Sequence, residues 1–183
     1  YNTSLNIYKT GRFDWIGENM NLPSEFLQLL SGYSDYNLSP YLAVYFYWIN
    51  TRVPPMDNPK IRQAMSLAID REALVKYITR GNQQPYASLV PNGLAGYKGL
   101  ELPLFDPKRA KQLLVEAGYT NPSDIPAITL KYNTSEGHKQ IAEAIQQMWK
   151  KHLGISVEIA NQEWKVFLKD IQAHNFQIGR MGW

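Results

Sequence analysis

The sequence predicts an α/β (mixed α+β) fold in which helices pack on a mixed sheet. From residue 127 onward, strand-like and helix-like segments alternate in a β-α-β-α-β order, which is typical of βαβ units. Two helix starts show a capping residue directly before a proline, at Asn58 and at Asp106, as expected for a proline in the first helical turn. An apolar content of 44% over 183 residues allows a sizeable core.

The helices are predicted from caps, prolines and apolar residues at helical spacing. Thr3 or Ser4 is expected to cap the first helix, and Gly11 to end it in a left-handed conformation. Asp70 is expected to cap a helix that runs to about Arg80. The predicted helices span residues 3–11, 22–32, 58–69, 70–80, 106–118, 135–152 and 163–173.

The strands are predicted from alternation and from runs of aromatic and β-branched residues. They span residues 12–17, 41–49, 127–132, 155–160 and 176–183. In the 41–49 strand one face is wholly apolar, whereas the other carries the hydroxyls of Tyr41, Tyr45 and Tyr47. This strand therefore has either a core side and a cleft side or two buried faces. The Gly- and Pro-rich segment 81–99 is predicted to be a long loop.

Several kinds of function have no support in the sequence. The absence of cysteine excludes disulfides and thiolate metal sites, and the histidines at 138, 152 and 174 are not spaced as local metal ligands. No nucleophile elbow or phosphate-binding glycine motif is present, so neither an enzyme nor a cofactor is predicted. A net charge of +3 from scattered basic residues does not predict a nucleic-acid partner. The 12 Tyr, 5 Trp and 6 Phe favour a binding module.

Four ordered stretches resemble a known family, the bacterial extracellular solute-binding proteins of peptide and nickel uptake (family 5), and especially its oligopeptide-binding subgroup. They are "NIYKTGRFDWIG", "PYLAVYFYWINTRVPPMDNPKIRQAMSLAIDREALV", "FDPKRAKQLLVEAGY" and "LKYNTSEGHKQIAEAIQQMWKKHLGISVEIANQEWKVFL". Each motif is weak alone, but their common order over nearly the whole chain is specific.

The resemblance implies one lobe of a type II periplasmic-binding-protein-like fold. Such proteins are two to three times longer and close two lobes around a peptide that an ABC transporter then takes up. Residues 1–183 are therefore expected to be a single, excised distal lobe, which would account for a chain that runs from Tyr1 to Trp183. The implied partners are short peptides and an ABC transporter permease. The resemblance also implies a monomeric protein in the periplasm or outside the cell, which would be a lipoprotein in a Gram-positive organism.

The resemblance also implies which residues meet the peptide. Arg180 and His138 match positions near the peptide's C-terminal carboxylate, where a guanidinium would form charge-assisted bonds. Gly182 and Trp183 would pair with the peptide main chain, as in strand addition. The other implied positions are Arg52 at the carboxylate, Asn133 and Trp164 at side-chain pockets and, on a looser match, Glu25.

Each of these residues also has a plain structural reading. Trp164 lies on an amphipathic stripe and could be a core residue, and Asn133 could be a turn residue. Arg52 and His138 could be ordinary surface residues. Arg180 could pair with a structural carboxylate. Relatives carry an aspartate a few residues after the Gly-Trp pair, where it meets the peptide's α-amino group, and that position follows Trp183. The ligand alternatives are a murein peptide, nickel or haem, and the lobe could also be the sensor domain of a regulator.

Overall fold

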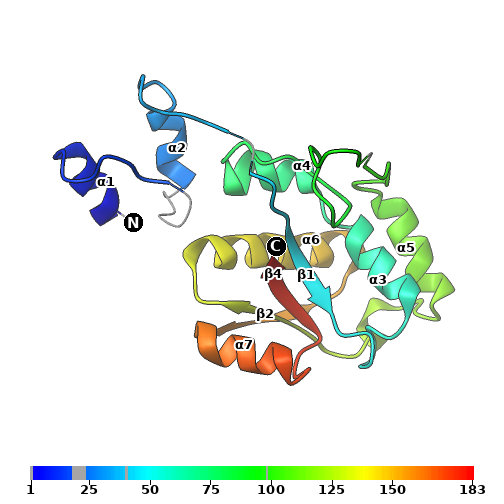
Figure 1. Ribbon diagram of the computed structural model, residues 1–183. Coiled ribbons are helices and arrows are strands. Elements are labelled where there is room, and N and C mark those ends of the chain that lie inside the picture. Colours follow the sequence, from blue (N-terminus) through cyan, green and yellow to red (C-terminus); the bar gives the residue numbers. More distant parts are fainter. Residues whose placement is uncertain (1, 18–23, 40, 98) are drawn as a thin grey trace.

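The computed structural model of the protein describes residues 2–17, 24–39, 41–97 and 99–183, without the side chains of Asn2, Ser24 and Glu25. Its helices are α1 (Asn2–Lys9), α2 (Ser24–Leu30), α3 (Pro59–Leu67), α4 (Arg71–Ala73), the π-helix η1 (Leu74–Thr79), α5 (Pro107–Glu116), the 3-10 helix η2 (Pro122–Asp124), α6 (Glu136–Leu153) and α7 (Trp164–Gln172). Its strands are β1 (Tyr45–Ile49), β2 (Ile128–Asn133), β3 (Val157–Gln162) and β4 (Ile178–Gly182). Figure 1 shows α1 and α2 to one side of a body formed by the sheet and the other helices.

The described strands form one mixed sheet in the order β1-β4-β2-β3. Strand β2 runs parallel to both β3 and β4, whereas β1 is antiparallel to β4. The predicted β-α-β-α-β order is therefore confirmed as β2-α6-β3-α7-β4. Because of these directions, the carboxyl ends of β2, β3 and β4 and the beginning of β1 lie at the same end of the sheet, where ligands commonly bind in α/β proteins.

Three predicted helix caps are confirmed. The side chains of Asn58, Asp70 and Asp106 each accept a hydrogen bond of 2.9 Å from a backbone N–H two or three residues further on. Each bond satisfies one of the donors that a helix start leaves without a helical partner. Beyond Asp70, however, the helix has only three α-helical residues and continues as η1, which ends at Thr79. The next residue, Arg80, caps it with a left-handed φ of 51°.

The predictions for the amino-terminal part were less accurate. Helix α1 begins at Asn2, so Thr3 and Ser4 lie within the helix and the expectation that they cap it was wrong. Gly11 does have the predicted left-handed conformation, with a φ of 71°. Residues 12–17 form no strand, because the described sheet offers this segment no partner and a strand is stable only when paired. Helix α2 lies within the predicted segment, but the predicted Pro23 start lies outside the described residues.

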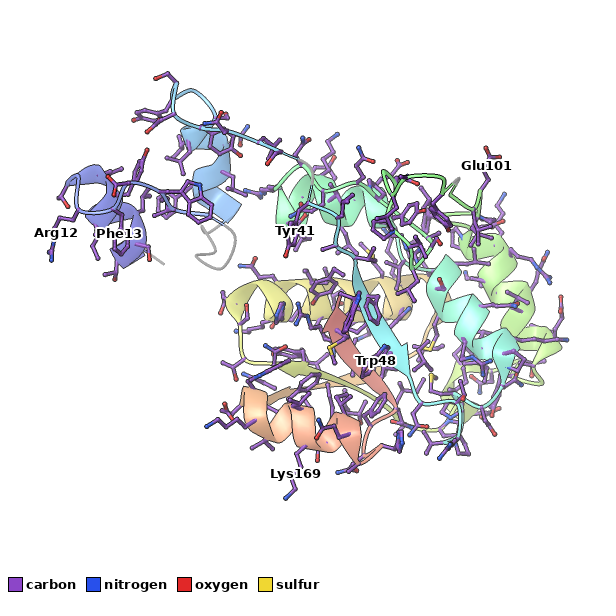
Figure 2. The ribbon with its side chains drawn as sticks, viewed as in Figure 1. Arg12, Phe13, Tyr41, Trp48, Glu101 and Lys169 are labelled. Carbon is purple, nitrogen blue, oxygen red and sulfur yellow. The ribbon has the colours of Figure 1, made fainter. Side chains whose placement is uncertain are left out.

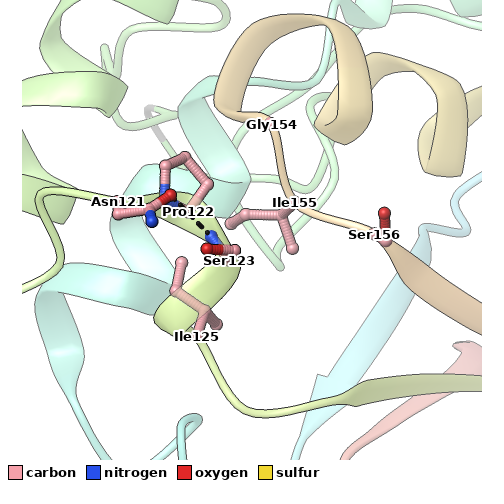
Figure 3. Close-up of a pocket in the computed structure, with 7 residues that line it drawn as sticks. All are labelled: Asn121, Pro122, Ser123, Ile125, Gly154, Ile155 and Ser156. Carbon is pink, nitrogen blue, oxygen red and sulfur yellow. Dashed lines mark hydrogen bonds between the residues drawn. The ribbon is translucent and has the colours of Figure 1, made fainter.

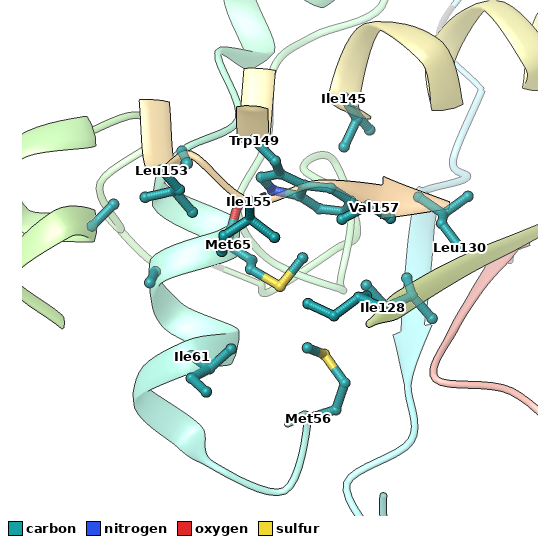
Figure 4. Close-up of a cluster of buried hydrophobic side chains, with 14 of the residues drawn as sticks. Met56, Ile61, Met65, Ile128, Leu130, Ile145, Trp149, Leu153, Ile155 and Val157 are labelled. Carbon is teal, nitrogen blue, oxygen red and sulfur yellow. Dashed lines mark hydrogen bonds between the residues drawn. The ribbon is translucent and has the colours of Figure 1, made fainter. Parts of the chain in front are cut away.

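The main core lies between the sheet and helices α3, α5 and α6 (Figure 4). The apolar stripes that the sequence predicts for these helices are buried there or packed against it. Trp149 of α6 is 3% exposed and donates its indole N–H to the carbonyl of Met65 on α3, at 2.8 Å. This bond ties two helices together across the core. No helix in the described ranges is long and apolar enough to cross a membrane.

Strand β1 is shorter and more exposed than predicted. It spans five residues, and its burial is partial on both faces, so the alternative of two buried faces was wrong. Tyr47 and Ile49 pack against the main core, whereas Trp48, on the wholly apolar face, is 42% exposed (Figure 2). The pairing with β4 explains why the face with Tyr47 and Ile49 is the one that meets the core. Ile49 lies opposite Ile178, which is part of the core, and directly opposed residues share a face.

The other face of the sheet is joined to α7 by a polar network. Asp170 of α7 accepts hydrogen bonds from Gln162 and Lys131, both at 2.7 Å, and from Asn175 at 3.2 Å. These bonds, that from Gln162 above all, lower the pKa of Asp170 to about 2. Since the same carboxyl group titrates near its ordinary value in an unfolded chain, ionised Asp170 favours the folded state.

This network predicts a defined acid sensitivity. The folded-state pKa of Asp170 lies below its unfolded value, so the stabilisation is complete above about pH 4 and is lost as the pH falls towards 2. We expect Asp170→Asn to lower the urea midpoint at pH 7, and to lower it progressively less at pH 4 and pH 2.5. The control is Asp124→Asn, a change on the exposed surface. A midpoint difference that does not vary with pH would contradict the role of the ionised carboxylate.

Candidate functional site at the carboxyl end of the sheet

Four elements bring polar side chains together at the carboxyl end of the parallel strands. Arg180 comes from β4, Asn133 from the end of β2, His138 from the first turn of α6 and Tyr45 from the start of β1. Asn133 and His138 are close in sequence because α6 follows β2 directly. Tyr45 and Arg180 are brought near each other by the antiparallel pairing of β1 with β4, in which Tyr45 lies opposite Gly182 and Tyr47 opposite Arg180. The fold thus assembles the cluster from residues up to 135 positions apart in the chain.

Arg180 is held by two contacts with neighbouring strands. Its Nη1 donates to the Oδ1 of Asn133 at 3.3 Å. Its guanidinium carbon lies 4.7 Å from the centre of the Tyr45 ring, within the range of a cation–π interaction. None of the ion pairs among the described residues includes Arg180, so the reading of Arg180 as the partner of a structural carboxylate finds no support there.

The ring of Tyr45 also meets His138. Its hydroxyl lies 3.4 Å from Nδ1 of His138, and the two ring centres are 5.6 Å apart. Tyr47 packs its ring edge-on against Tyr45, with 5.9 Å between the centres. These contacts place an aromatic and imidazole wall beside the guanidinium.

The cluster has one net positive charge at neutral pH. Burial, and then the neighbouring charge of Arg180, lower the pKa of His138 to about 4, so its imidazole is neutral. Burial raises the pKa of Tyr45 and raises that of Tyr47 further, so both phenols are neutral too. Although 38% of the Tyr45 surface is accessible, its hydroxyl end faces His138 inside the cluster. Only Arg180 is charged, and an anion is the complementary ligand.

Two polar atoms of the cluster, the hydroxyl of Tyr47 and Nε of Arg180, are buried and have no hydrogen-bond partner among the described residues. Buried polar atoms are normally paired, because an unpaired one keeps its desolvation cost. Together with the uncompensated charge, they indicate a site that is arranged for a further polar group.

Strand β4 offers an open main-chain edge beside this cluster. Val44 and Trp183 exchange backbone hydrogen bonds of 2.8 and 3.1 Å, and in an antiparallel ladder the next residue turns its N–H and C=O the other way. Those of Gly182 therefore point away from β1. On that side the pairing of β4 with β2 ends at Gly179, so the described strands leave the main chain of Gly182 free for another strand.

The remaining predicted residues lie outside the cluster. Trp164 begins α7, is 44% exposed and stacks on Phe167, so it is not a core residue. The side chain of Trp183 is 91% exposed. Its backbone N–H and C=O both bond to Val44, so they do not offer the main-chain pairing that the resemblance implied for this residue. Arg52 is exposed in the turn that follows β1, at the opposite end of that strand from Tyr45, and the structure does not bring it to Arg180. The side chain of Glu25 lies outside the described residues.

Sequence reasoning missed the part that Tyr45 and Tyr47 play in the site. The signal was available, because alternation placed both hydroxyls on one face of the predicted strand and hydroxyls on a partly buried face need partners. What could not be read from the sequence was that Arg180 and His138 lie on the same side.

Another hollow in the structure has no comparable chemistry. A pocket lined by Asn121, Pro122, Ser123, Ile125, Gly154, Ile155 and Ser156 lies where the 3-10 helix η2 meets the end of α6 (Figure 3). Its lining contains no charged side chain. The described residues also contain no group of three or more side chains suited to hold a metal ion. The cluster around Arg180 combines an uncompensated charge with buried polar atoms that lack a partner among the described residues, and it is the best candidate for a functional site.

Comparison with known proteins gives consistent matches over the whole chain. Residues 2–183 match the family described as "Bacterial extracellular solute-binding proteins, family 5 Middle". The chain is 40% identical to the oligopeptide-binding protein OppA of Bacillus subtilis over 190 aligned residues, which cover 100% of this chain and 35% of that protein.

Solved structures agree with this match. A periplasmic oligopeptide-binding protein from Borrelia burgdorferi superposes with a TM-score of 0.88 at 36% identity, over 99% of this chain and 36% of the other. The unliganded open form of the murein tripeptide binding protein MppA superposes with a TM-score of 0.82 at 32% identity, over 100% and 36% of the two chains. The chain thus has about a third of the length of the proteins it matches.

Proposed function

Because the chain belongs to family 5 of the bacterial extracellular solute-binding proteins, we propose that residues 1–183 form the distal, ligand-closing lobe of an oligopeptide-binding protein. The relatives' greater length supports a second lobe made by other parts of a longer chain. Helices α1 and α2 lie apart from the body (Figure 1), and they and the segments beside them expose Trp15, Leu29 and Tyr33. Large apolar side chains of this kind commonly contact another part of a protein.

The observation that carries the proposal is the uncompensated charge of Arg180. A guanidinium binds a carboxylate with two parallel hydrogen bonds, and Arg180 lies in a partly buried cluster whose other members are neutral at pH 7. A peptide's C-terminal carboxylate is a ligand group of matching charge and shape. His138 and Asn133 lie beside it as hydrogen-bonding partners.

The open edge at Gly182 supports a peptide over a smaller anion. An extended peptide that pairs with the free N–H and C=O of Gly182 adds a strand to the sheet, which gives affinity without requiring a particular sequence. Trp183 and Trp164 are exposed aromatic surfaces near the ends of β4 and β3, and they are proposed to line side-chain pockets. Arg52 and Glu25 remain weaker candidates.

The complete protein would act without catalysis, outside the cytoplasm, and would deliver peptides to an ABC transporter permease as a monomer. In a Gram-positive organism it would be a lipoprotein. Domain closure around a bound ligand is the motion expected of such a receptor, and this lobe would be one of the two rigid bodies. A murein peptide would present the same carboxylate.

Calorimetric titration of the complete protein tests the proposal. We expect tri- and tetrapeptides with a free C-terminus to bind at micromolar or tighter affinity, and the same peptides with a C-terminal amide to bind at least 10-fold more weakly, since the amide lacks the charge that Arg180 binds. Including a murein tripeptide separates the two peptide classes. The proposal fails if neither free acids nor amides bind.

The isolated chain provides a second, opposite expectation. Without a second lobe to enclose the ligand, residues 1–183 should fold with a cooperative thermal transition but bind the same peptides very weakly or not at all. Micromolar binding to this chain alone would contradict the two-lobe proposal, and a non-cooperative transition would contradict an independently folded lobe.

A further inference from the structure

Tyr45 touches every other ring or charged group of the cluster, although it was not among the predicted site residues. Arg180 lies over its ring at 4.7 Å, His138 faces its hydroxyl at 3.4 Å, and Tyr47 packs against its edge. These groups come from β4, α6 and β1. Tyr45 therefore contacts side chains from all three elements.

We propose that Tyr45 is a positioning residue, which holds the guanidinium of Arg180 and the imidazole of His138 in the orientation that receives a ligand carboxylate. The inference rests on the proposed function above. It adds a residue that favours binding of a carboxylate but does not itself form the charge-assisted bond between Arg180 and the ligand. Its ring holds Arg180, and its hydroxyl holds His138.

The geometry of Arg180 shows why such a residue is needed. A long arginine side chain loses considerable rotamer freedom when it is fixed, and the hydrogen bond that Arg180 donates to Asn133 is long at 3.3 Å. One bond at Nη1 leaves the guanidinium plane free to turn about it. The face of the Tyr45 ring provides a second, broad contact that fixes this plane before the ligand arrives, and such preorganisation raises affinity.

Gly182 leaves space for the ligand beside the group that Tyr45 fixes. Gly182 lies directly opposite Tyr45 in the β1–β4 pairing, and directly opposed residues share a face. A Cβ atom at this position would lie 3.5 Å from Nη2 of Arg180. Since glycine has no such atom, the space next to Nη2 on this face of the sheet is not filled by a side chain of residue 182.

The hydroxyl of Tyr45 has a separate effect on His138. In a neutral histidine only one of the two ring nitrogens carries a proton. The hydrogen-bond partner at one nitrogen determines which of the two is protonated. At 3.4 Å, the Tyr45 hydroxyl is the partner of Nδ1. A hydroxyl that donates to Nδ1 leaves the proton on Nε2, where it can be donated to a ligand oxygen. The titratable groups around it are Tyr47, His138, Arg180 and, beyond Tyr47, Tyr132.

The test compares Tyr45→Leu and Tyr45→Phe in the complete protein, with calorimetric titration of one peptide as its free acid and as its C-terminal amide. Loss of the ring in Tyr45→Leu should weaken binding of the free acid by about 2- to 30-fold and leave binding of the amide within about 2-fold. Tyr45→Phe keeps the ring and should retain most of the affinity for the free acid. The matched control is Tyr77→Leu, which removes another exposed tyrosine with a cation, Lys76, over its ring at 5.2 Å.

A purely structural role predicts a different pattern. An equal loss for the free acid and the amide in Tyr45→Leu, or no loss for either, would overturn the proposal. If the wild-type protein binds peptides but does not distinguish acid from amide, carboxylate recognition at Arg180 fails, and the positioning proposal fails with it. If wild type distinguishes them and Tyr45→Leu does so equally well, only the role of Tyr45 fails.

A second measurement covers the case in which Tyr45→Leu does not fold. Nitrogen-15 chemical shifts of the His138 ring report which nitrogen carries the proton, and Tyr45→Phe removes only the hydroxyl. We expect these shifts to change in Tyr45→Phe, whereas those of His174, a surface residue, stay the same. Unchanged His138 shifts would overturn the part assigned to the hydroxyl.

Discussion

Replacing Arg180 by methionine in the complete protein should weaken binding of free-acid peptides by about 10- to 150-fold, or about 1.5–3 kcal/mol, the usual range for a lost hydrogen bond to a charged group. Methionine keeps much of the length and apolar volume of arginine but removes the only charge of the cluster. Calorimetric titration with matched free acids and amides measures the effect. Binding of the amides should change far less, because they bring no charge to the site.

Two further variants sharpen this result. Arg180→Lys keeps the charge but loses the planar pair of donors, so we expect an affinity between those of wild type and Arg180→Met. Arg109→Met removes an arginine on α5 whose ion pair is with Glu116, and it serves as a control for the loss of one surface charge. If Arg180→Met weakens free acids and amides by the same factor, Arg180 does not recognise the carboxylate.

Replacing Trp149 by alanine should lower the free energy of unfolding by about 3–5 kcal/mol, as is usual when a large aromatic side chain leaves a core. Trp149 is surrounded by Ile145, Leu153 and Val157 in Figure 4, so its removal creates a cavity. It also leaves the buried carbonyl of Met65 without its indole partner. Urea unfolding of the isolated chain measures the change.

Trp164 is the matched comparison, because it is also a tryptophan on a helix but is 44% exposed. Trp164→Ala should cost less than about 1 kcal/mol of stability, as expected for a change outside the core, while it lowers peptide affinity in the complete protein. Trp149→Phe keeps most of the volume and should be intermediate, which provides a measurement if the alanine variant does not fold. Equal destabilisation by the two alanine variants would contradict the assignment of Trp164 to a pocket.

The helices were more predictable than the strands because their signals are local. The caps at Asn58, Asp70 and Asp106 satisfy backbone groups two or three residues away, so the sequence near each cap is enough to place a helix start. A strand is stable only when it is paired. Residues 12–17 have a strand-like sequence but no partner. The predicted strand 41–49 also began too early, because the pairing with the end of the chain starts at Val44, which exchanges backbone hydrogen bonds with Trp183.

The candidate site was predicted in part, and only through resemblance to a family. The resemblance pointed to Asn133, His138 and Arg180, and the structure brings these three together. It also pointed to Arg52, which lies at the far end of β1. Neither spacing nor composition could have grouped them, because the cluster depends on which strands are neighbours in the sheet.

The sequence by itself determined where α3, α4 and α5 begin, which stripes of α3, α5 and α6 are apolar, and that β1 has one wholly apolar face and one face with tyrosines. The tertiary structure decided which of these faces meets the core. Hydrophobicity alone favours burying the wholly apolar face, yet Tyr47 and Ile49 pack inward and Trp48 remains exposed. The reason is register: pairing with β4 places Ile49 beside the buried Ile178 and places Tyr45 and Tyr47 beside Gly182 and Arg180. The tyrosine hydroxyls thus become part of a charged cluster that no local pattern could have revealed.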